Sequence, residues 1–350
     1  MRKTCTCFFV QPAVLEHIVR TGTPEQRDIA LETLGRDHSI RTVRLQNALL
    51  SDFYQLRSRS LVEPTPGTIK RVIFDAEQSE NAETTKVVWN EGDKAVADPA
   101  VNEAADGLGA TFRLYWEIYK RNSIDDRGRN LNAVVHYGKN YDNAFWNGSR
   151  MVFGDGDGEF LTRTTQGVDV IGHELTHAVT ESTANLAYTG QSGALNESIS
   201  DAFGSLVKQY AAGQTADQAD WLIGDKIVGK ALKGKALRSM AKPGTAFEGD
   251  NQPAHMDHYV KTTADSGGVH TNSGIPNCAF YHVAMAIGGK AWEKAGLIWY
   301  DSLRDPRLTP DSNFQRFAQL TLRAAQHHFG AGAESKAVTE AWKAVGIVLT

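Results

Sequence analysis

The sequence is poor in cysteine and contains no long apolar run. Three cysteines occur in 350 residues, Cys5, Cys7 and Cys278, which excludes a disulfide-rich scaffold. No apolar stretch reaches the length of a membrane-spanning helix. The N-terminus lacks the apolar core and small-residue cleavage site of a standard secretion signal. We therefore expect no membrane span, and a protein that is cytoplasmic or exported by a non-standard route.

A strong excess of charge of one sign is also lacking. The formal net charge is −4, which gives no reason to expect a nucleic-acid or membrane-surface partner. The charge is unevenly placed, because residues 1–70 are net basic and the remainder is net acidic. This pattern is consistent with a leader that docks onto the body of the same chain. We expect a monomer.

What is present is the composition of a globular protein, with 41% hydrophobic and 22% charged residues. Residues 1–65 are predicted to form a small helical leader and a linker, with one helix from Thr23 to Gly35. Short β-branched and aromatic runs predict strands within residues 66–185. Helical periodicity dominates residues 186–350. The predicted fold class is therefore α+β, with a β-rich half followed by a helical half.

The segment VIGHELTHAVT, from residue 170 to 180, places polar side chains within an apolar helical pattern. Residues four apart lie on one face of a helix, so His173 and His177 can bind one metal ion. The Glu174 side chain is rotated away from the line that joins the two histidines, but it can reach a water or substrate bound to the metal. This is the arrangement of zinc peptidases, in which the glutamate is the general base.

A third ligand is predicted twenty residues after His177, at Glu197. Glu197 and Asp201 are again four apart on a predicted helix. Glu197 would complete a site of two histidines and one glutamate, with a fourth position open to water. Asp201 would accept the second ring N–H of a ligand histidine. No histidine occurs within residues 178–194, which argues against the peptidases that use a third histidine there.

Two alternatives remain open from these residues. A zinc aminopeptidase uses the same ligand types but needs carboxylates for a free amine, and we find no convincing cluster of that kind. A non-enzymatic peptide-binding protein could retain a zinc site as a relic. The intact Glu174 argues against a relic, because a site without catalysis does not need the base.

From residue 69 onward the sequence resembles the thermolysin family of neutral metalloendopeptidases. The resemblance is carried, in family order, by the motifs NAFWNG (143–148), MVFGDGDG (151–158), HELTH (173–177), GALNE (193–197) and GGVHTNSGIPN (267–277). The short leader is similar to that of the protealysin branch. The resemblance implies a two-domain fold with the zinc site at the junction of the β-rich and helical halves.

The resemblance also implies roles for residues outside the zinc ligands. His270 is expected in a glycine-rich loop whose flexible backbone brings it near the reacting carbonyl. It would stabilise the oxyanion with Tyr188, and Asp265 would hold His270 protonated. Further residues would bind the substrate: Asn143 and Ala144 on an edge strand, Arg238 at the substrate carbonyl, and Val170 and Leu161 lining the specificity pocket. That pocket would favour a bulky apolar residue just after the cleaved bond.

The leader contains a segment, CTCFFVQPAVL from residue 5 to 15, that is expected to block the active site. We expect its apolar side chains to fill the cleft: Phe8, Phe9, Val14 and Leu15. Pro12 fixes the backbone and resists cleavage nearby. Cys5 or Cys7 could also ligate zinc as a thiolate. The protein is thus predicted to be a zinc endopeptidase synthesised as a self-inhibited precursor, or zymogen, that acts on peptides and proteins.

The family's double calcium site is altered. Lys208 stands where a carboxylate ligand is expected, and Leu222 replaces another. A lysine supplies positive charge but cannot ligate a cation. Because Asp169, Asp220 and Asp225 remain acidic, at most one calcium ion is expected.

Overall fold

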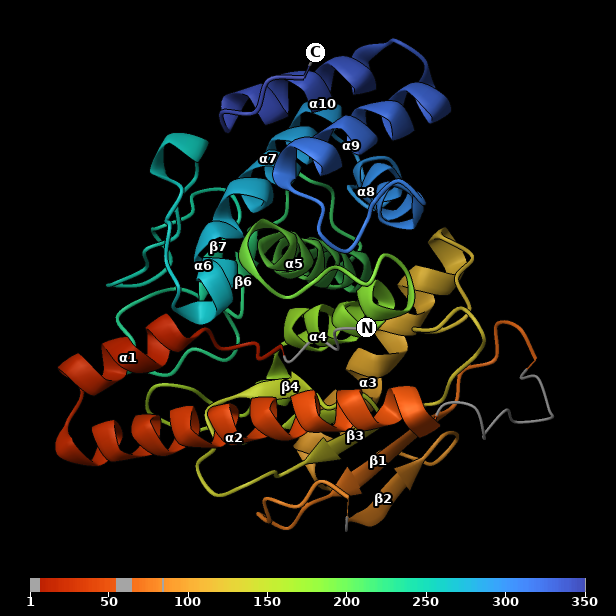
Figure 1. Cartoon of the computed structure of the whole chain (residues 1–350). Coiled ribbons are helices and arrows are strands. Elements are labelled where there is room, and N and C mark those ends of the chain that lie inside the picture. The colour runs from red at the N-terminus through yellow and green to blue at the C-terminus, as the bar shows by residue number, and fades with distance from the viewer. Residues whose placement is uncertain (1–6, 55–64, 84, 350) are drawn as a thin grey trace.

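The computed structural model describes residues 7–54, 65–83 and 85–349, with the side chains of 43–54 excepted. A two-helix leader lies against a sheet-rich half, and a helical half follows (Figure 1). Helices α4 (Val168–Ser182) and α5 (Gly190–Ala212) run through the middle of the molecule, where the two halves meet. The predicted order of strands and then helices is therefore the order that the structure has.

The larger sheet has five strands in the order β2-β1-β3-β5-β4. The strands are β1 (Arg71–Asp75), β2 (Lys86–Asn90), β3 (Leu131–Val135), β4 (Ala144–Trp146) and β5 (Met151–Phe153). The three inner strands are parallel, and the two edge strands β2 and β4 are antiparallel to their neighbours. Strand β4 is thus an edge strand of the sheet, on the side nearest α4.

The leader forms helices α1 (Pro12–Thr21) and α2 (Pro24–Tyr54). As predicted, α2 begins with a capping box, since Thr23 N donates to Gln26 Oε1 and Gln26 N to Thr23 Oγ1. The prediction that Gly35 ends this helix is wrong. Among the described atoms, none lies within 4 Å of a Cβ at Gly35, and a single exposed glycine costs a helix only about 1 kcal/mol.

Helices α4 and α5 cross at very short range because glycines face each other at the contact. A Cβ added to Gly204 of α5 would lie 2.6 Å from Asp169 O of α4. A Cβ added to Gly172 would lie 3.1 Å from the Cα of Gly204. Any larger residue would push the helices apart, so this pair of glycines sets the distance between the polar residues on the two helices.

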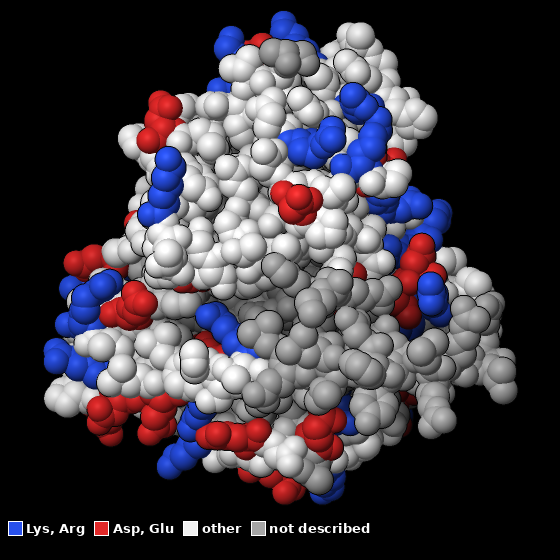
Figure 2. All heavy atoms as spheres, in the orientation of Figure 1, with Lys and Arg blue, Asp and Glu red and all other residues white. Residues whose placement is uncertain are grey.

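The remaining helices surround α5 on the far side from the sheet (Figure 1). They are α6 (Asp265–Asn272), α7 (Gly274–Ile287), α8 (Ala295–Arg304), α9 (Phe314–Phe329) and α10 (Ala333–Ala344). Helix α3 (Pro99–Arg113) packs beside α4, and both helices contact the sheet. Among the described residues, no helix is long and apolar enough to cross a membrane. On the face in Figure 2, the described basic and acidic side chains are interspersed.

Candidate active site

The predicted metal ligands converge between α4 and α5. His173 Nε2 lies 3.0 Å from His177 Nε2. The Glu197 carboxylate is 3.5 Å from each of these nitrogens. All three side chains are at most 1% exposed. The two i, i+4 pairs predicted from the sequence therefore face each other across the close helix crossing.

Each histidine is oriented by a partner on α5. His173 Nδ1 lies 2.8 Å from Asp201 Oδ1, and His177 Nδ1 lies 2.9 Å from Asn196 Oδ1. These contacts place the proton on Nδ1 and turn Nε2 of each ring inward. Burial lowers the pKa of the His177 imidazole to about 3, which keeps this ring in the neutral form that binds metal.

The donor set fits zinc. Two atoms bound to one tetrahedral zinc ion at about 2.0–2.1 Å are separated by roughly 3.3 Å, and the three donor separations here are 3.0, 3.5 and 3.5 Å. Nitrogen and carboxylate oxygen are both donors that zinc accepts. Together with buried, pre-oriented rings, this means that His173, His177 and Glu197 would hold the ion.

Glu174 is buried beside the ligands and is tied to the edge strand. Its Oε2 accepts a hydrogen bond of 3.0 Å from Trp146 N of β4. Glu174 also belongs with His173 and His177 to a group whose ligand atoms lie within 4.8 Å of one another. The carboxylate thus lies between the predicted metal ligands and the strand predicted to bind substrate, a position compatible with the predicted role of general base.

Asp201 joins the metal ligands to Arg238, a connection that the sequence did not predict. Its carboxylate contacts His173 and also accepts two hydrogen bonds of 2.8 Å from the Arg238 guanidinium. Asn277 Nδ2 donates a further bond of 2.8 Å. Burial alone would raise the pKa of Asp201, but Arg238 and His173 outweigh it and hold the pKa well below its usual value. Asp201 therefore remains charged and fixes both partners.

The predicted oxyanion group is assembled around His270. His270 Nδ1 lies 2.7 Å from Asp265 Oδ1, and Tyr188 OH lies 3.1 Å from His270 Nε2. Tyr188 also donates to Glu197. Burial lowers the pKa of His270, but the charges of Asp265 and Glu197 outweigh it and raise the pKa above its usual value. A cationic His270 can then donate from Nε2, as predicted.

The expectation that His270 lies in a flexible loop is wrong. His270 belongs to α6, whose first turn has backbone in the left-handed region, with φ of 51° at Ser266 and 90° at Gly267. This turn brings Asp265 back onto the histidine, so that His270 N also donates to Asp265 Oδ2 at 2.9 Å. The histidine is held by its own helix and is not carried by a mobile segment.

The leader occupies the cleft between β4 and the metal ligands. Phe8 pairs with Phe145 as an antiparallel bridge, and Phe9 N donates to Ala144 O at 3.0 Å. Val10 N donates to Asn143 Oδ1 at 2.8 Å. Residues 8–10 therefore lie along the edge of the sheet and are joined to it by one bridge and two hydrogen bonds, where Asn143 and Ala144 were predicted to bind a substrate backbone.

The Phe9 side chain fills an apolar pocket behind the metal ligands. Its ring centre is 5.1 Å from the His173 ring and 4.6 Å from the Arg238 guanidinium. The pocket floor is open because Gly224 has no side chain; a Cβ there would lie 3.1 Å from the Phe9 ring. Val170 and Leu161 are fully buried in the same apolar cluster. Their role as pocket lining stays a prediction.

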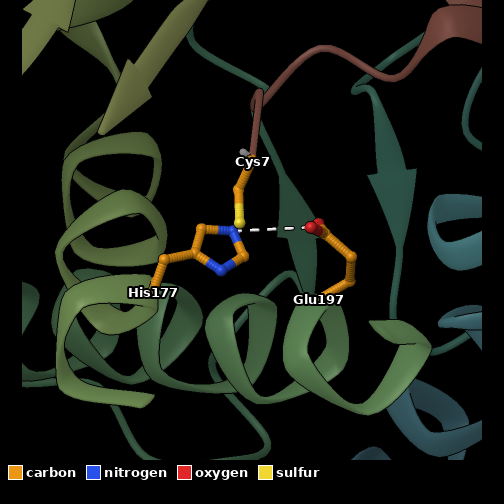
Figure 3. Close-up of side chains that lie close together, drawn as sticks. All are labelled: Cys7, His177 and Glu197. Carbon is orange, nitrogen blue, oxygen red and sulfur yellow. Dashed lines mark ion pairs between the residues drawn. The ribbon is translucent and has the colours of Figure 1, made fainter. Parts of the chain in front are cut away.

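The other predicted leader residues lie differently. Pro12 begins α1 and Leu15 is buried within it, so neither belongs to the strand in the cleft. Cys5 lies outside the described residues. Cys7 is 1% exposed, and its sulfur points toward the His177 ring and the Glu197 carboxylate (Figure 3). The ligand atoms of these three residues lie within 4.8 Å of one another.

Lys208 occupies the cluster of carboxylates in which calcium was considered. Its Nζ lies 2.9 Å from Asp220 and 2.6 Å from Asp225. Asp169 instead accepts backbone hydrogen bonds from Val170 and Gly224. The lysine ammonium thus supplies a cation that is part of the chain, and one calcium ion at this site stays a prediction.

We expect the Lys208 ammonium to stabilise the folded chain at this carboxylate cluster. Lys208→Met should lower the melting temperature by about 3 °C or more, because it leaves the partly buried Asp225 carboxylate without its cationic partner. The measurement is thermal unfolding with and without calcium and a calcium chelator, with the exposed Lys233→Met as control. An unchanged melting temperature in Lys208→Met would contradict the role assigned to this ammonium.

A second buried contact holds the leader on the edge strand. Asp37 of α2 is 5% exposed and accepts hydrogen bonds from Tyr141 OH at 2.6 Å and from Asn143 Nδ2 at 2.8 Å. Burial raises the pKa of Asp37 to about 7, although these hydrogen bonds and Arg41 act in the opposite direction. No sequence motif marks Asp37, because its partners are more than 100 residues away.

Docking of the leader should weaken as the pH rises from about 4 to about 7. The pKa of free aspartate is about 3.9, and that of docked Asp37 is about 7. Between these values docking requires Asp37 to bind a proton, so docking becomes less favourable as the pH rises. Amide hydrogen exchange of α1, corrected for intrinsic rates and measured in a Glu174→Gln chain, should show this loss of protection. Asp37→Asn should flatten the dependence; an equal slope in both chains would exclude Asp37 as its source.

Comparisons with known proteins agree with this geometry. Residues 31–181 match the family described as "Thermolysin metallopeptidase, catalytic domain", and residues 184–347 match "Thermolysin metallopeptidase, alpha-helical domain". An extracellular metalloprotease of Pectobacterium carotovorum subsp. carotovorum is 46% identical over 352 residues, covering 99% of this chain and 98% of that protein. A thermolysin of Alicyclobacillus acidocaldarius subsp. acidocaldarius is 42% identical, covering 74% of this chain and 48% of that protein.

Among solved structures, the precursor of protealysin, a metalloproteinase from Serratia proteamaculans, superposes with a TM-score of 0.87 at 47% identity. The match covers 98% of this chain and 100% of that one. Fold and site define a metalloendopeptidase of two domains. The chain belongs to the thermolysin metallopeptidase family and is similar to its protealysin-like members. The predicted family, fold class and enzyme class are confirmed.

Proposed function

We propose that this protein is a zinc endopeptidase synthesised as a self-inhibited precursor, and that it cuts before bulky apolar residues of peptides and proteins. The observation that carries the proposal is the position of leader residues 8–10. They contact the predicted substrate-binding residues Asn143 and Ala144, while the Phe9 side chain fills the pocket beside Arg238. The compartment stays a prediction: cytoplasmic, or reached by a non-standard export route.

Each residue of the proposed active site has a definite task in the reaction. Zinc, when bound, polarises the reacting carbonyl and its attacking water. Glu174 takes the proton of that water and delivers it to the leaving nitrogen. His270 and Tyr188 donate hydrogen bonds to the developing oxyanion, and Arg238 holds the carbonyl of the residue after the cleaved bond. The Asp201 carboxylate keeps Arg238 and His173 in place.

The geometry favours an endopeptidase over the aminopeptidase alternative. The leader contacts the site on both sides of the Phe8–Phe9 bond, with Cys7 beside His177 and Glu197 and Val10 at Asn143. An aminopeptidase must close one end of its cleft around a free amine. The buried Glu174 beside the ligands also supports catalysis over mere peptide binding.

The test is the time course of activity in the purified full-length chain with zinc. Hydrolysis of a blocked peptide with phenylalanine after the cleaved bond should begin only as the leader is lost, as followed by intact mass. Phe9→Ser should give measurable activity in the intact chain before any cleavage, because its side chain no longer fills the pocket, while the exposed Leu31→Ala of α2 should not. Full activity of the intact chain would contradict self-inhibition.

A thiolate of Cys7 would strengthen the block by taking the open position on zinc. Cys7 is disulfide-bonded, so ligation requires a thiol reductant to release it. In the cobalt-substituted Glu174→Gln chain, reduction should produce a sulfur-to-cobalt absorption band that Cys7→Ser lacks. If both chains give the same spectrum, Cys7 does not ligate the metal.

A further inference from the structure

The strand of the leader in the cleft has a definite register against the catalytic residues. Phe8 O lies 3.1 Å from His270 Nε2, which is the predicted oxyanion donor. Arg238 Nη1 donates to Phe9 O at 2.9 Å, the contact expected for the carbonyl after a cleaved bond. These two neighbouring carbonyls therefore define which peptide bond lies at the reaction centre.

The nitrogen of the same peptide bond is also held. Phe9 N donates to Ala144 O at 3.0 Å, and two residues further along β4 Trp146 N holds Glu174. The base is thus anchored on the strand that holds the nitrogen. From this register we infer that the leader binds as a substrate, with the Phe8–Phe9 bond at the reaction centre, and that the enzyme hydrolyses this bond in its own chain.

The inference rests on the proposed function and names its first substrate. Water adds to the Phe8 carbonyl carbon, the bond between that carbon and Phe9 N breaks, and the proton passes through Glu174 to Phe9 N. The products are a carboxylate at Phe8 and an amine at Phe9. The register also assigns phenylalanine before and after the cleaved bond as a sequence that the cleft accepts.

This cut alone does not release the leader. Residues 9–54 include both docked helices, α1 and α2, and stay in one piece after the cut. Asp37 still accepts hydrogen bonds from Asn143 and Tyr141. Val10 O also accepts a hydrogen bond from Asn143 Nδ2 at 3.3 Å. The chain that begins at Phe9 should therefore be a second latent form, in which Phe9 and Val10 still fill the cleft.

The experiment follows the full-length chain with zinc by intact mass and N-terminal sequencing. A species beginning at Phe9 should appear with a first-order rate independent of chain concentration, before activity on a blocked peptide appears, and should be absent from Glu174→Gln. Phe9→Leu should retain the cut within about threefold, Phe9→Ser should slow it about tenfold or more, and Leu31→Ala should leave it unchanged.

Amide hydrogen exchange supplies a readout that needs no activity. In the Glu174→Gln chain, the Phe9 and Val10 amides should be protected, and Arg238→Lys should reduce that protection. A chain that becomes active on blocked peptides without ever forming the Phe9 species overturns this inference alone. A zinc-loaded chain that hydrolyses neither its leader nor any peptide overturns the proposed function and this inference together.

Discussion

Glu174→Gln should retain the metal and lose about 10³-fold or more in kcat/KM on a blocked peptide. The amide is nearly the same size as the carboxylate but cannot accept the proton of the attacking water. The measurement compares steady-state kinetics of wild type and variant after the leader has been removed by the same external protease. Metal content by elemental analysis and the melting temperature should stay close to those of wild type.

Two results would separate this role from a structural one. Trp146 N donates to Glu174 Oε2, and a glutamine can still accept that bond through its amide oxygen, so the position of β4 should be preserved. Glu174→Asp keeps a carboxylate but moves it away from the attacking water by one methylene group. This variant should retain more activity than Glu174→Gln. Activity of Glu174→Gln above a tenth of wild type would remove Glu174 from the role of general base.

Glu197→Ala should lose most of its bound zinc, and His173→Ala and His177→Ala should do the same. In the proposed site three side chains bind the ion, and removing one leaves only two donors for zinc. Zinc content measured after dialysis, with activity in parallel, tests the assignment. Full zinc in Glu197→Ala would mean that the third ligand has been misassigned. A chelator should abolish activity reversibly.

Asp201 provides the graded comparison for the same measurement. Asp201→Asn should weaken zinc binding by about ten- to a hundredfold, because the amide orients His173 less well. The asparagine variant is preferable to alanine, since alanine would leave the Arg238 guanidinium buried without its carboxylate. Loss of zinc as complete as in Glu197→Ala would place Asp201 among the direct ligands.

The zinc residues could be predicted because helical spacing alone decides which side chains share a face. His173 with His177, and Glu197 with Asp201, needed only the 3.6-residue period of a helix. The bond between Asp201 and Arg238 could not be predicted in this way, because it depends on how β7 (Arg238–Ser239) packs against α5. Spacing gives no information on pairs brought together by tertiary packing.

The leader shows a different limit. A proline suits both an extended segment and the first turn of a helix. The sequence around Pro12 was therefore compatible with an extended inhibitory segment that continues to Leu15. The structure instead starts α1 at Pro12 and confines the strand in the cleft to the residues before it. Likewise Gly35 is a plausible helix end, but packing of α2 on the edge strand through Asp37 carries the helix past it.

The three partners of Asp201 have a thermodynamic consequence. One carboxylate holds a zinc ligand, His173, and the arginine that binds the peptide carbonyl, Arg238. Any shift of Asp201 on loading the ion therefore changes the site for the peptide, and reciprocity requires the peptide to change the affinity for the ion by the same factor. The leader binds Arg238 through Phe9 O, so zinc and the leader are expected to change each other's affinity for the chain by one common factor.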